Sequence, residues 1–447
     1  MTRRLYAWLM WLAQPILRRK LAQRGVQEPG YLEALDEHYG YYSASAWAAD
    51  GNTVWVHAVS LGETRAAAVL VARLRQHFPA MRLLLTHGTA TGRAEGASLL
   101  RTGDRQTWRP WDTPAAVQRF LDQFKPRIGI LMETEVWPNL AAGCQRLGVP
   151  LVLANARLSE VSLKRARRLA WLARPAYRSL AAVWAQTQDD AARLNALGAS
   201  VQGVFGNLKF DATPDAQQLA TGRAWRARAT RPVVMFASSR DGEEAALLQI
   251  LESFRPLAPV GIAQDAIDSV ATGVQWLIVP RHPQRFDEVA ALIERHGFTV
   301  SRRSDWGDGP PAAGADRARP GVWLGDSLGE MALYYGLAEV ALLGGSFEPL
   351  GGQNLIEAAA CACPVLMGPH TFNFAEAAEL AQAAGAALRL ASLPAAVAAA
   401  QTLANDAPAH AAMVSAATRF SGAHRGAVEK TAAAVAALLG QQGVDGL

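Results

Sequence analysis

Residues 54–63 read VWVHAVSLGE, an apolar run that ends in Ser-Leu-Gly and a carboxylate. The β-branched and aromatic residues predict a strand over 54–59, and a helical pattern over 64–77 follows almost at once. Gly62 would let the backbone turn tightly between the two elements or approach a ligand closely. The segment therefore predicts a strand–turn–helix unit with Glu63 at the carboxyl end of the strand.

This unit recurs along the 447 residues, which is enough chain for two or three domains. Further strands are predicted at 82–85, 128–132, 151–154, 183–185, 201–205, 233–237, 276–280, 322–324, 340–343 and 365–367, with helical stretches such as 114–124 between them. Strands that alternate with helices predict parallel sheets. We therefore expect an α/β protein of two Rossmann-like, doubly wound lobes with an interdomain cleft.

The domain boundaries follow from composition. The first lobe is predicted at 25–212, a polar linker at 213–231, and the second lobe at 232–440, with a last helix that could pack back on the first lobe. The stretch 307–320, which is rich in Gly, Pro and Ala, predicts a surface loop.

The amino-terminal residues 5–17 read LYAWLMWLAQPIL between Arg3-Arg4 and Arg18-Arg19-Lys20. This run is shorter than the roughly 20 residues that span a bilayer. Trp8 and Trp11 lie three apart, and tryptophan favours the headgroup zone. The pattern predicts an interfacial anchor helix over 1–24. An ordinary packed helix and a tilted single span stay open as alternatives.

Charge and cysteine content limit the classes of partner and the cellular compartment that we expect for this protein. The net charge is +5, but the basic residues are scattered apart from 18–20 and 164–168, so the pattern does not favour nucleic-acid binding. The two basic runs suit a membrane surface or a solvated helix face. The cysteines are Cys144, Cys361 and Cys363, an odd number without zinc spacing, which predicts a reducing compartment and no disulfides.

Polar residues follow three predicted strands of the first lobe. Glu63 suits a general base for a hydroxyl group, or simply a helix cap. In LMETEVWPN (131–139), Glu133 and Glu135 would face one side of an extended chain and bind ligand, or pair with an arginine such as Arg157. The predicted rim of the cleft consists of Ser60, Gly62, Glu133, Glu135, Asn155 and Arg157.

The second lobe carries anion-binding patterns at three strand ends. In VPRHPQR (279–285), two arginines and a histidine suit phosphate, although a solvated basic turn would look the same. In LGGSFEPLGGQNLIE (343–357), glycine N–H groups could wrap a phosphate and the helix carboxylate could hold a ribose, unless the glycines are only connections. The segment ASSRDGEE (237–244) opens a helix, which favours an anion or a cap. The candidate donor residues here are Ser238, Arg240, Arg281, His282, Arg285, Gly344, Gly345, Ser346, Asn354 and Glu357.

The sequence lacks the characteristic motifs of several classes of enzyme. The sequence has no D-x-D pair, Walker A loop, clean G-x-G-x-x-G, G-x-S-x-G elbow or H-E-x-x-H helix. We therefore expect no metal and no cofactor.

Seven motifs occur in an order that resembles the family of 3-deoxy-D-manno-octulosonic acid (Kdo) transferases. They are HAVSLGE, ETEVWPN, NARLS, GNLKFD (206–211), PRHPQR, GGSFEPLGGQNLIEAA and GPHTFNF (368–374). The resemblance implies an inverting GT-B glycosyltransferase that moves Kdo from CMP-Kdo to a lipid A precursor, on the cytoplasmic face of the bacterial inner membrane and in contact with its lipids.

The resemblance also implies residue roles. Glu63 would be the general base, the basic loop at 281–285 would bind the donor, and the glycine segment at 344–357 would bind CMP. Lys209 would add a donor contact. The family more often has Thr-His where this chain has Ser239-Arg240, so Arg240 is expected to contact phosphate or carboxylate rather than shuttle a proton.

Three other functions fit parts of the pattern. A sugar-nucleotide epimerase would use similar lobes but would need no anchor. A non-catalytic binder of lipid A or nucleotide would not need Glu63. A lipid-directed transferase with a UDP-sugar donor would differ in its nucleotide.

Overall fold

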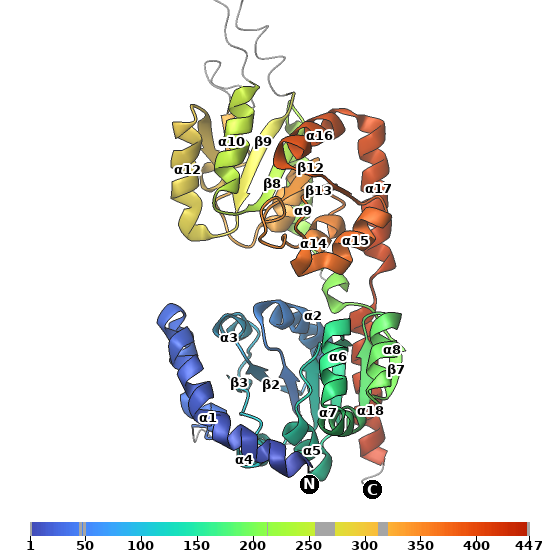
Figure 1. Cartoon of the computed structure of the whole chain (residues 1–447). Coiled ribbons are helices and arrows are strands. Elements are labelled where there is room, and N and C mark those ends of the chain that lie inside the picture. Colours follow the sequence, from blue (N-terminus) through green and yellow to red (C-terminus); the bar gives the residue numbers. More distant parts are fainter. Residues whose placement is uncertain are drawn as a thin grey trace, which may run out of the picture. The chain divides into compact units, whose positions relative to one another are not determined.

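The computed structural model describes residues 2–43, 47, 51–211, 213–254, 273–311 and 321–444. The chain forms two compact units, Met1–Asp211 with His424–Leu447, and Ala212–Ala423 (Figure 1). Each unit is an α/β domain, as the sequence predicts.

The first unit contains a parallel sheet in the order β3-β2-β1-β4-β5-β6-β7. Its strands are β1 (Thr53–His57), β2 (Arg82–His87), β3 (Arg105–Trp108), β4 (Ile128–Met132), β5 (Leu151–Ala156), β6 (Ala182–Ala185) and β7 (Val201–Val204). Its helices are α1 (Thr2–Gln27), α2 (Leu61–His77), α3 (Ala90–Ala97), α4 (Pro114–Phe124), α5 (Pro138–Arg146), α6 (Glu160–Arg168), α7 (Ala170–Arg178), α8 (Gln188–Ala196) and α18 (Ala427–Val444). The prediction missed β3, a polar, half-exposed strand at the sheet edge.

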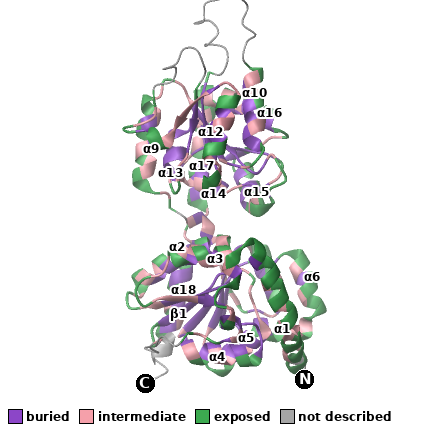
Figure 2. Cartoon of the chain, turned by 90° about the vertical axis from the view of Figure 1, so that its left-hand side faces the viewer, coloured by how far each residue is buried: buried purple, intermediate pink, exposed green. Residues whose placement is uncertain are grey.

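Both faces of this sheet are buried, which explains the continuous apolar runs of its strands. Trp55 of β1 packs with residues of α4 and α5, whereas its neighbours Val54 and Val56 pack with residues of α2 and α18. Figure 2 shows the strands as a buried layer between helices with exposed outer faces.

The second unit contains a parallel sheet in the order β10-β11-β9-β8-β12-β13-β14. Its strands are β8 (Val233–Ser239), β9 (Gln275–Pro280), β10 (Thr299–Arg302), β11 (Gly321–Leu324), β12 (Val340–Leu343), β13 (Val365–Met367) and β14 (Ala387–Arg389). Its helices are α9 (Ala216–Arg228), α10 (Glu243–Ser253), α12 (Phe286–Arg295), α13 (Met331–Leu337), α14 (Leu355–Ala360), α15 (Ala375–Ala383), α16 (Leu393–Asn405) and α17 (Ala407–Ala423). The prediction missed the short edge strands β10 and β14. The predicted loop at 307–320 is described only to residue 311, so the rest of it lies outside the described residues.

The interpretation of 213–231 as a linker is wrong. Most of it forms α9, which begins at the cap Asp215 and packs on α13. Gly222 lies so close to Leu333 that a β-carbon would sit 2.1 Å from the Leu333 carbonyl oxygen, and Trp225, three residues on, is buried. The prediction failed because α9 buries only one narrow face, so its sequence is as polar as that of a linker. The final helix α18 belongs to the first unit.

The amino-terminal segment forms the 26-residue helix α1, with Pro15 inside it. Trp8 and Trp11 are 61% and 60% exposed, and Leu5, Leu9, Leu12 and Ile16 are exposed as well. Within the described part of the chain, no helix has both the length and the apolar character that a bilayer crossing requires.

Candidate active site

The candidate residues gather where each sheet reverses its strand order. The reversal lies between β1 and β4 in the first unit, and between β8 and β12 in the second. Ligands of doubly wound sheets bind outside the carboxyl ends of the strands at this point. Glu63 and Glu133 follow β1 and β4, while Arg240 and Gly344 follow β8 and β12. Each unit therefore carries its own group of candidate residues.

Glu63 lies in the first turn of α2, with Ser60 as the helix cap. One carboxylate oxygen accepts the Val59 N–H at 2.9 Å, and the other accepts the Ser60 hydroxyl at 3.1 Å. Because α2 already begins at Leu61, Gly62 lies in a helical turn rather than in the tight turn that the sequence predicted. The carboxylate is thereby held in one orientation at the strand end.

The pKa of Glu63 is raised to about 7. Burial is the largest cause, and the charges of Glu133 and Glu135 add to it, while the hydrogen bonds from Val59 and Ser60 act in the opposite direction. A carboxylate with this pKa can both accept and release a proton near neutral pH, which suits a general base.

Glu133 and Glu135 do not face one side of an extended chain, so that prediction is wrong. Glu133 has a left-handed backbone (φ 58°), so the chain turns directly after β4 and is not extended over these two residues. Glu133 pairs with Lys209 at 3.2 Å, whereas Glu135 accepts the Trp137 indole N–H at 2.8 Å. Among the described residues neither carboxylate pairs with Arg157, whose side chain is exposed.

Glu135 also lies beside the fully buried His57, 4.0 Å from its Nε2 atom. Burial opposes ionisation of Glu135, but the neighbouring His57, the charge of Arg109 and the Trp137 N–H lower its pKa to about 2. Burial lowers the pKa of His57, while the neighbouring Glu135 acts in the opposite direction. Glu135 is therefore a fixed negative charge near Glu63.

Asn155 is not on a rim, contrary to the prediction. It is 2% exposed, with a left-handed backbone (φ 53°), and its side-chain oxygen accepts the Leu208 N–H at 3.0 Å. Asparagine adopts this conformation more readily than most residues, which accounts for its position here. Asn155 therefore serves the backbone rather than a ligand.

In the second unit, the basic loop after β9 lies beside Arg240. Burial and the charges of Arg240, Arg281 and Arg285 lower the pKa of His282, so the three arginines lie near this ring. Arg285 is committed to carboxylates, at 2.9 Å from the fully buried Glu244 and within 3.4 Å of Asp241 and Glu288. Arg240 and Arg281 are half-exposed.

The glycine loop after β12 does not offer its N–H groups as the sequence predicted. The N–H of Gly345 donates to both carboxylate oxygens of Glu243, at 2.9 and 2.8 Å. Those of Gly344 and Gly352 donate to the carbonyls of Ala237 and Gly345. Glu243 also accepts the Arg240 N–H at 2.9 Å, so it joins the loops that follow β8 and β12.

The first half of this loop is packed too tightly for a ligand. A β-carbon on Gly344 would lie 2.4 Å from the Ser238 carbonyl oxygen. Ser346 is fully buried, donates to the Leu343 carbonyl and accepts the Gly368 N–H at 2.8 Å. Ser346 therefore joins two loops internally, and its position does not support direct donor binding.

The remaining donor candidates are half-exposed. Asn354 caps the six-residue helix α14 by accepting the Ile356 N–H at 3.2 Å, and Glu357 lies one turn into that helix. Ser238 has a left-handed backbone (φ 54°) within β8.

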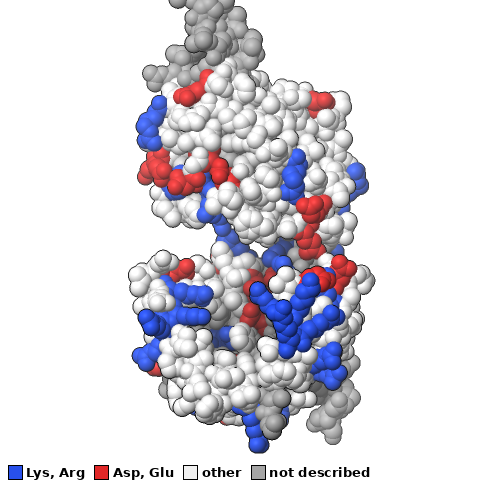
Figure 3. All heavy atoms as spheres, viewed as in Figure 1, with Lys and Arg blue, Asp and Glu red and all other residues white. Residues whose placement is uncertain are grey.

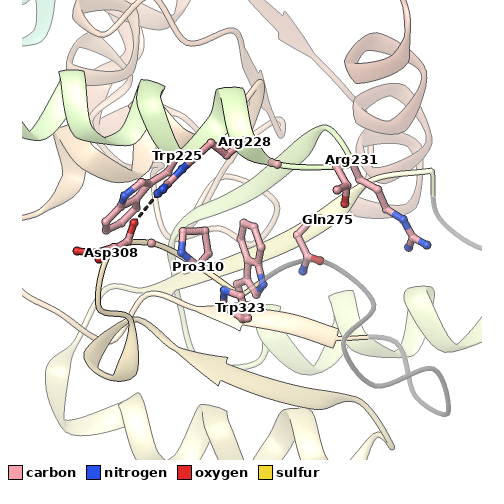
Figure 4. Close-up of a pocket in the computed structure, with 11 residues that line it drawn as sticks. Trp225, Arg228, Arg231, Gln275, Asp308, Pro310 and Trp323 are labelled. Atoms are coloured by element: carbon pink, nitrogen blue, oxygen red, sulfur yellow. Dashed lines mark hydrogen bonds between the residues drawn. The ribbon is translucent and has the colours of Figure 1, made fainter.

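No group of three or more His, Cys, Asp or Glu that could hold a metal ion occurs among the described residues. All three cysteines are free and buried, as the sequence predicts. A pocket of about 320 Å³ lies elsewhere, near the start of β9, between Trp225, Pro310 and Trp323 (Figure 4). Arg228 at this pocket donates to the Asp308 carbonyl, and none of the candidate site residues lines it.

The sequence reasoning missed Glu243 and Glu244 as individual residues. Both are essentially unexposed, and both fix candidate donor loops. The sequence pattern that could have identified them is two consecutive acidic residues at the start of an otherwise apolar helix. A carboxylate buried there needs hydrogen-bond or charged partners.

Solved structures with this arrangement include a glycosyltransferase from Rickettsia africae and MurG from Acinetobacter baumannii. Each is 12% identical, covers 87% of this chain and 99% of its own, and superposes with a TM-score of 0.51. At this identity the likeness concerns the fold alone, which together with the two doubly wound sheets is the GT-B fold.

A family model for 3-deoxy-D-manno-octulosonic-acid transferase matches residues 33–212. The Kdo transferase of Bordetella pertussis is 45% identical over 410 residues, 90% of this chain and 91% of the relative. That of Haemophilus influenzae is 32% identical over 381 residues, 84% of each. This chain belongs to the Kdo transferase family, glycosyltransferases of lipopolysaccharide biosynthesis.

Proposed function

We propose that this enzyme transfers Kdo from CMP-Kdo to a lipid A precursor with inversion of the anomeric carbon, on the cytoplasmic face of the inner membrane. The observation that carries the proposal is Glu63, a carboxylate at the strand reversal of the first unit with a pKa of about 7. The relatives that share most of the chain are Kdo transferases, which supports Kdo as the sugar.

The chemistry needs one base. Glu63 takes the proton of an acceptor hydroxyl while the hydroxyl oxygen bonds to the anomeric carbon of Kdo. The bond from that carbon to the phosphate oxygen breaks, and CMP leaves with the electron pair. Attack opposite the leaving group inverts the carbon, as in other inverting glycosyl transfers. Glu63 then releases its proton to solvent.

The leaving phosphate would be met by the basic group of the second unit. Arg240 and Arg281 are half-exposed there, and guanidinium groups bind phosphate in fork geometry. CMP leaves as a phosphate monoester that needs little protonation, so fixed cations can stabilise it. We propose that the transfer step uses no metal and no cofactor.

Two surfaces of the first unit suit the lipid-bearing acceptor. The exposed Trp8 and Trp11 lie on α1, and α6 carries exposed Lys164, Arg165, Arg167 and Arg168. Figure 3 shows basic side chains gathered over α6. Tryptophan at the headgroup level and basic residues near anionic lipid both favour membrane contact.

The test is transfer in vitro from CMP-Kdo to a tetraacylated lipid A precursor, read by mass spectrometry. A product heavier by whole Kdo units, formed by the wild type and lost with Glu63→Gln, would support both the reaction and the base. If the folded wild type binds CMP but forms no product, the assignment of these substrates fails. Competition by CMP but not UDP separates this proposal from a UDP-sugar transferase.

A further inference from the structure

Lys209 lies in the first unit, in a short 3-10 helix, η3 (Leu208–Asp211), that ends where the chain leaves this unit. The resemblance to Kdo transferases implied a donor contact for Lys209. Its Nζ instead lies 3.2 Å from Glu133, and both side chains are largely buried, at 26% and 14% exposed. A shielded ion pair is screened less than a surface pair.

The partner Glu133 has an unfavourable backbone conformation. Its φ of 58° is left-handed, which costs energy for a residue with a β-carbon, and such strain persists only where the surroundings enforce it. Asn155, at the end of the neighbouring strand β5, is left-handed as well. Both residues are held by η3: Asn155 accepts the Leu208 N–H, and Glu133 pairs with Lys209.

The other two residues of η3 hold the returning chain. The ring of Phe210 stacks on that of His424, with centroids 4.9 Å apart. The carboxylate of Asp211 accepts the N–H groups of Gly426 and Val428, at the start of α18. The short helix η3 thus contacts the ends of β4 and β5. It also contacts the chain at both boundaries of the first unit, after Asp211 and before His424.

We propose that Lys209 is a positioning residue for the carboxyl ends of β4 and β5, where the acceptor would bind. Through η3 it also connects these strand ends to the two places where the chain passes between the units. The ion pair holds Glu133 in its left-handed conformation and so maintains the surroundings of Glu63. This inference rests on the proposed function, because it assigns Lys209 to the acceptor side of that reaction and not to the donor.

The variants are Lys209→Met, Lys209→Arg, Glu133→Gln and the double variant Lys209→Met/Glu133→Gln, in the full-length enzyme. Lys430→Met is the matched control, since Lys430 is exposed on α18 of the same unit. Calorimetry measures the affinity for CMP. Transfer kinetics are measured with CMP-Kdo and the lipid acceptor, and hydrogen exchange reports local order.

Lys209→Met is expected to lower kcat by about tenfold and to leave the CMP dissociation constant within about twofold, because a small displacement near the reacting groups costs rate rather than donor binding. Exchange should quicken over 131–137 and 206–211 but not over 281–286. Lys209→Arg should restore the rate, and the double variant should be no slower than Lys209→Met, because both changes remove one interaction.

The opposite pattern would overturn the proposal. CMP binding weakened about tenfold or more by Lys209→Met, with unchanged exchange over 131–137, would make Lys209 a donor contact. If the wild type transferred no Kdo, the proposed function would fail, while hydrogen exchange would still decide whether Lys209 orders the loop at Glu133.

Discussion

Ser60 and Glu63 hydrogen-bond to each other in both directions. The hydroxyl oxygen of Ser60 accepts the Glu63 N–H at 3.3 Å, and the same hydroxyl donates to the Glu63 carboxylate at 3.1 Å. This arrangement resembles a capping box, in which a carboxylate three residues into a helix turns back to its start. The two interpretations of Glu63, cap and base, are therefore compatible: capping holds the carboxylate at the strand end.

The first prediction separates these two roles. Glu63→Gln should lower kcat by about 10²–10⁴-fold, because the base is lost, without a drop in Tm, since glutamine also serves in a capping box. Glu63→Ala should lose the rate and about 1 kcal/mol of stability as well. Transfer assays and thermal unfolding of both variants check this. Equal destabilisation by both substitutions would contradict it.

The second prediction concerns pH. Because Glu63 must be ionised to act as a base and has a pKa of about 7, kcat/KM should fall as the pH drops below 7. The charge of Glu133 is among the causes of the raised pKa, so Glu133→Gln should move this limb to lower pH. A pH–rate profile of both proteins measures the shift, and an unmoved limb would argue against Glu63 as the titrating group.

The same pKa has a consequence for stability. The Glu63 pKa lies above its ordinary value of 4.5, so the protonated form favours folding. This contribution is fully present below about pH 4.5 and is lost as the pH rises through about 7. Wild type should therefore lose stability relative to Glu63→Gln between these values. Denaturant unfolding at pH 5 and pH 8 compares them, and a constant difference would contradict the raised pKa.

The fourth prediction concerns Glu243, which joins the loops after β8 and β12. Glu243→Ala would leave the buried Gly345 N–H without a partner, at a cost of about 1–3 kcal/mol, and would loosen Arg240. CMP binding should weaken, as calorimetry can show. The control is Glu252→Ala on the same helix, whose carboxylate pairs with His296 at 3.0 Å away from the donor loops. If Glu243→Ala bound CMP as tightly as the wild type, the hydrogen bonds of Glu243 to Arg240 and Gly345 would not be needed for donor binding.

The fifth prediction concerns Gly344. A β-carbon there would overlap the Ser238 carbonyl, so Gly344→Ala should destabilise the enzyme by about 1–3 kcal/mol. Gly440→Ala is the control, because no atom lies within 4 Å of the new β-carbon and α18 would gain about 0.5–1 kcal/mol from a better helix former. Denaturant unfolding distinguishes the two signs. A neutral Gly344→Ala would mean that the loop relaxes easily.

The sequence alone was sufficient for the fold class and for the strand ends at which the candidate site residues lie. The apolar runs at β1, β4, β8 and β12 are buried on both faces, so their composition signals parallel strands without knowledge of neighbours. Polar residues directly after such strands must lie at the carboxyl edge, which is why Glu63 and Arg240 could be placed from the pattern. Short edge strands such as β10 escaped because a half-exposed strand carries no such signal.

Tertiary structure alone decided which groups are available for chemistry. The glycines at 344–345 look like a phosphate cradle until Glu243, about a hundred residues away in sequence, proves to hold the Gly345 N–H. Lys209 was expected to contact the donor, and the fold places its Nζ beside Glu133. Local pattern determines where a strand ends and which residues come directly after it. Which hydrogen bonds and charges are already satisfied depends on residues that only folding brings together, so the sequence could not reveal it.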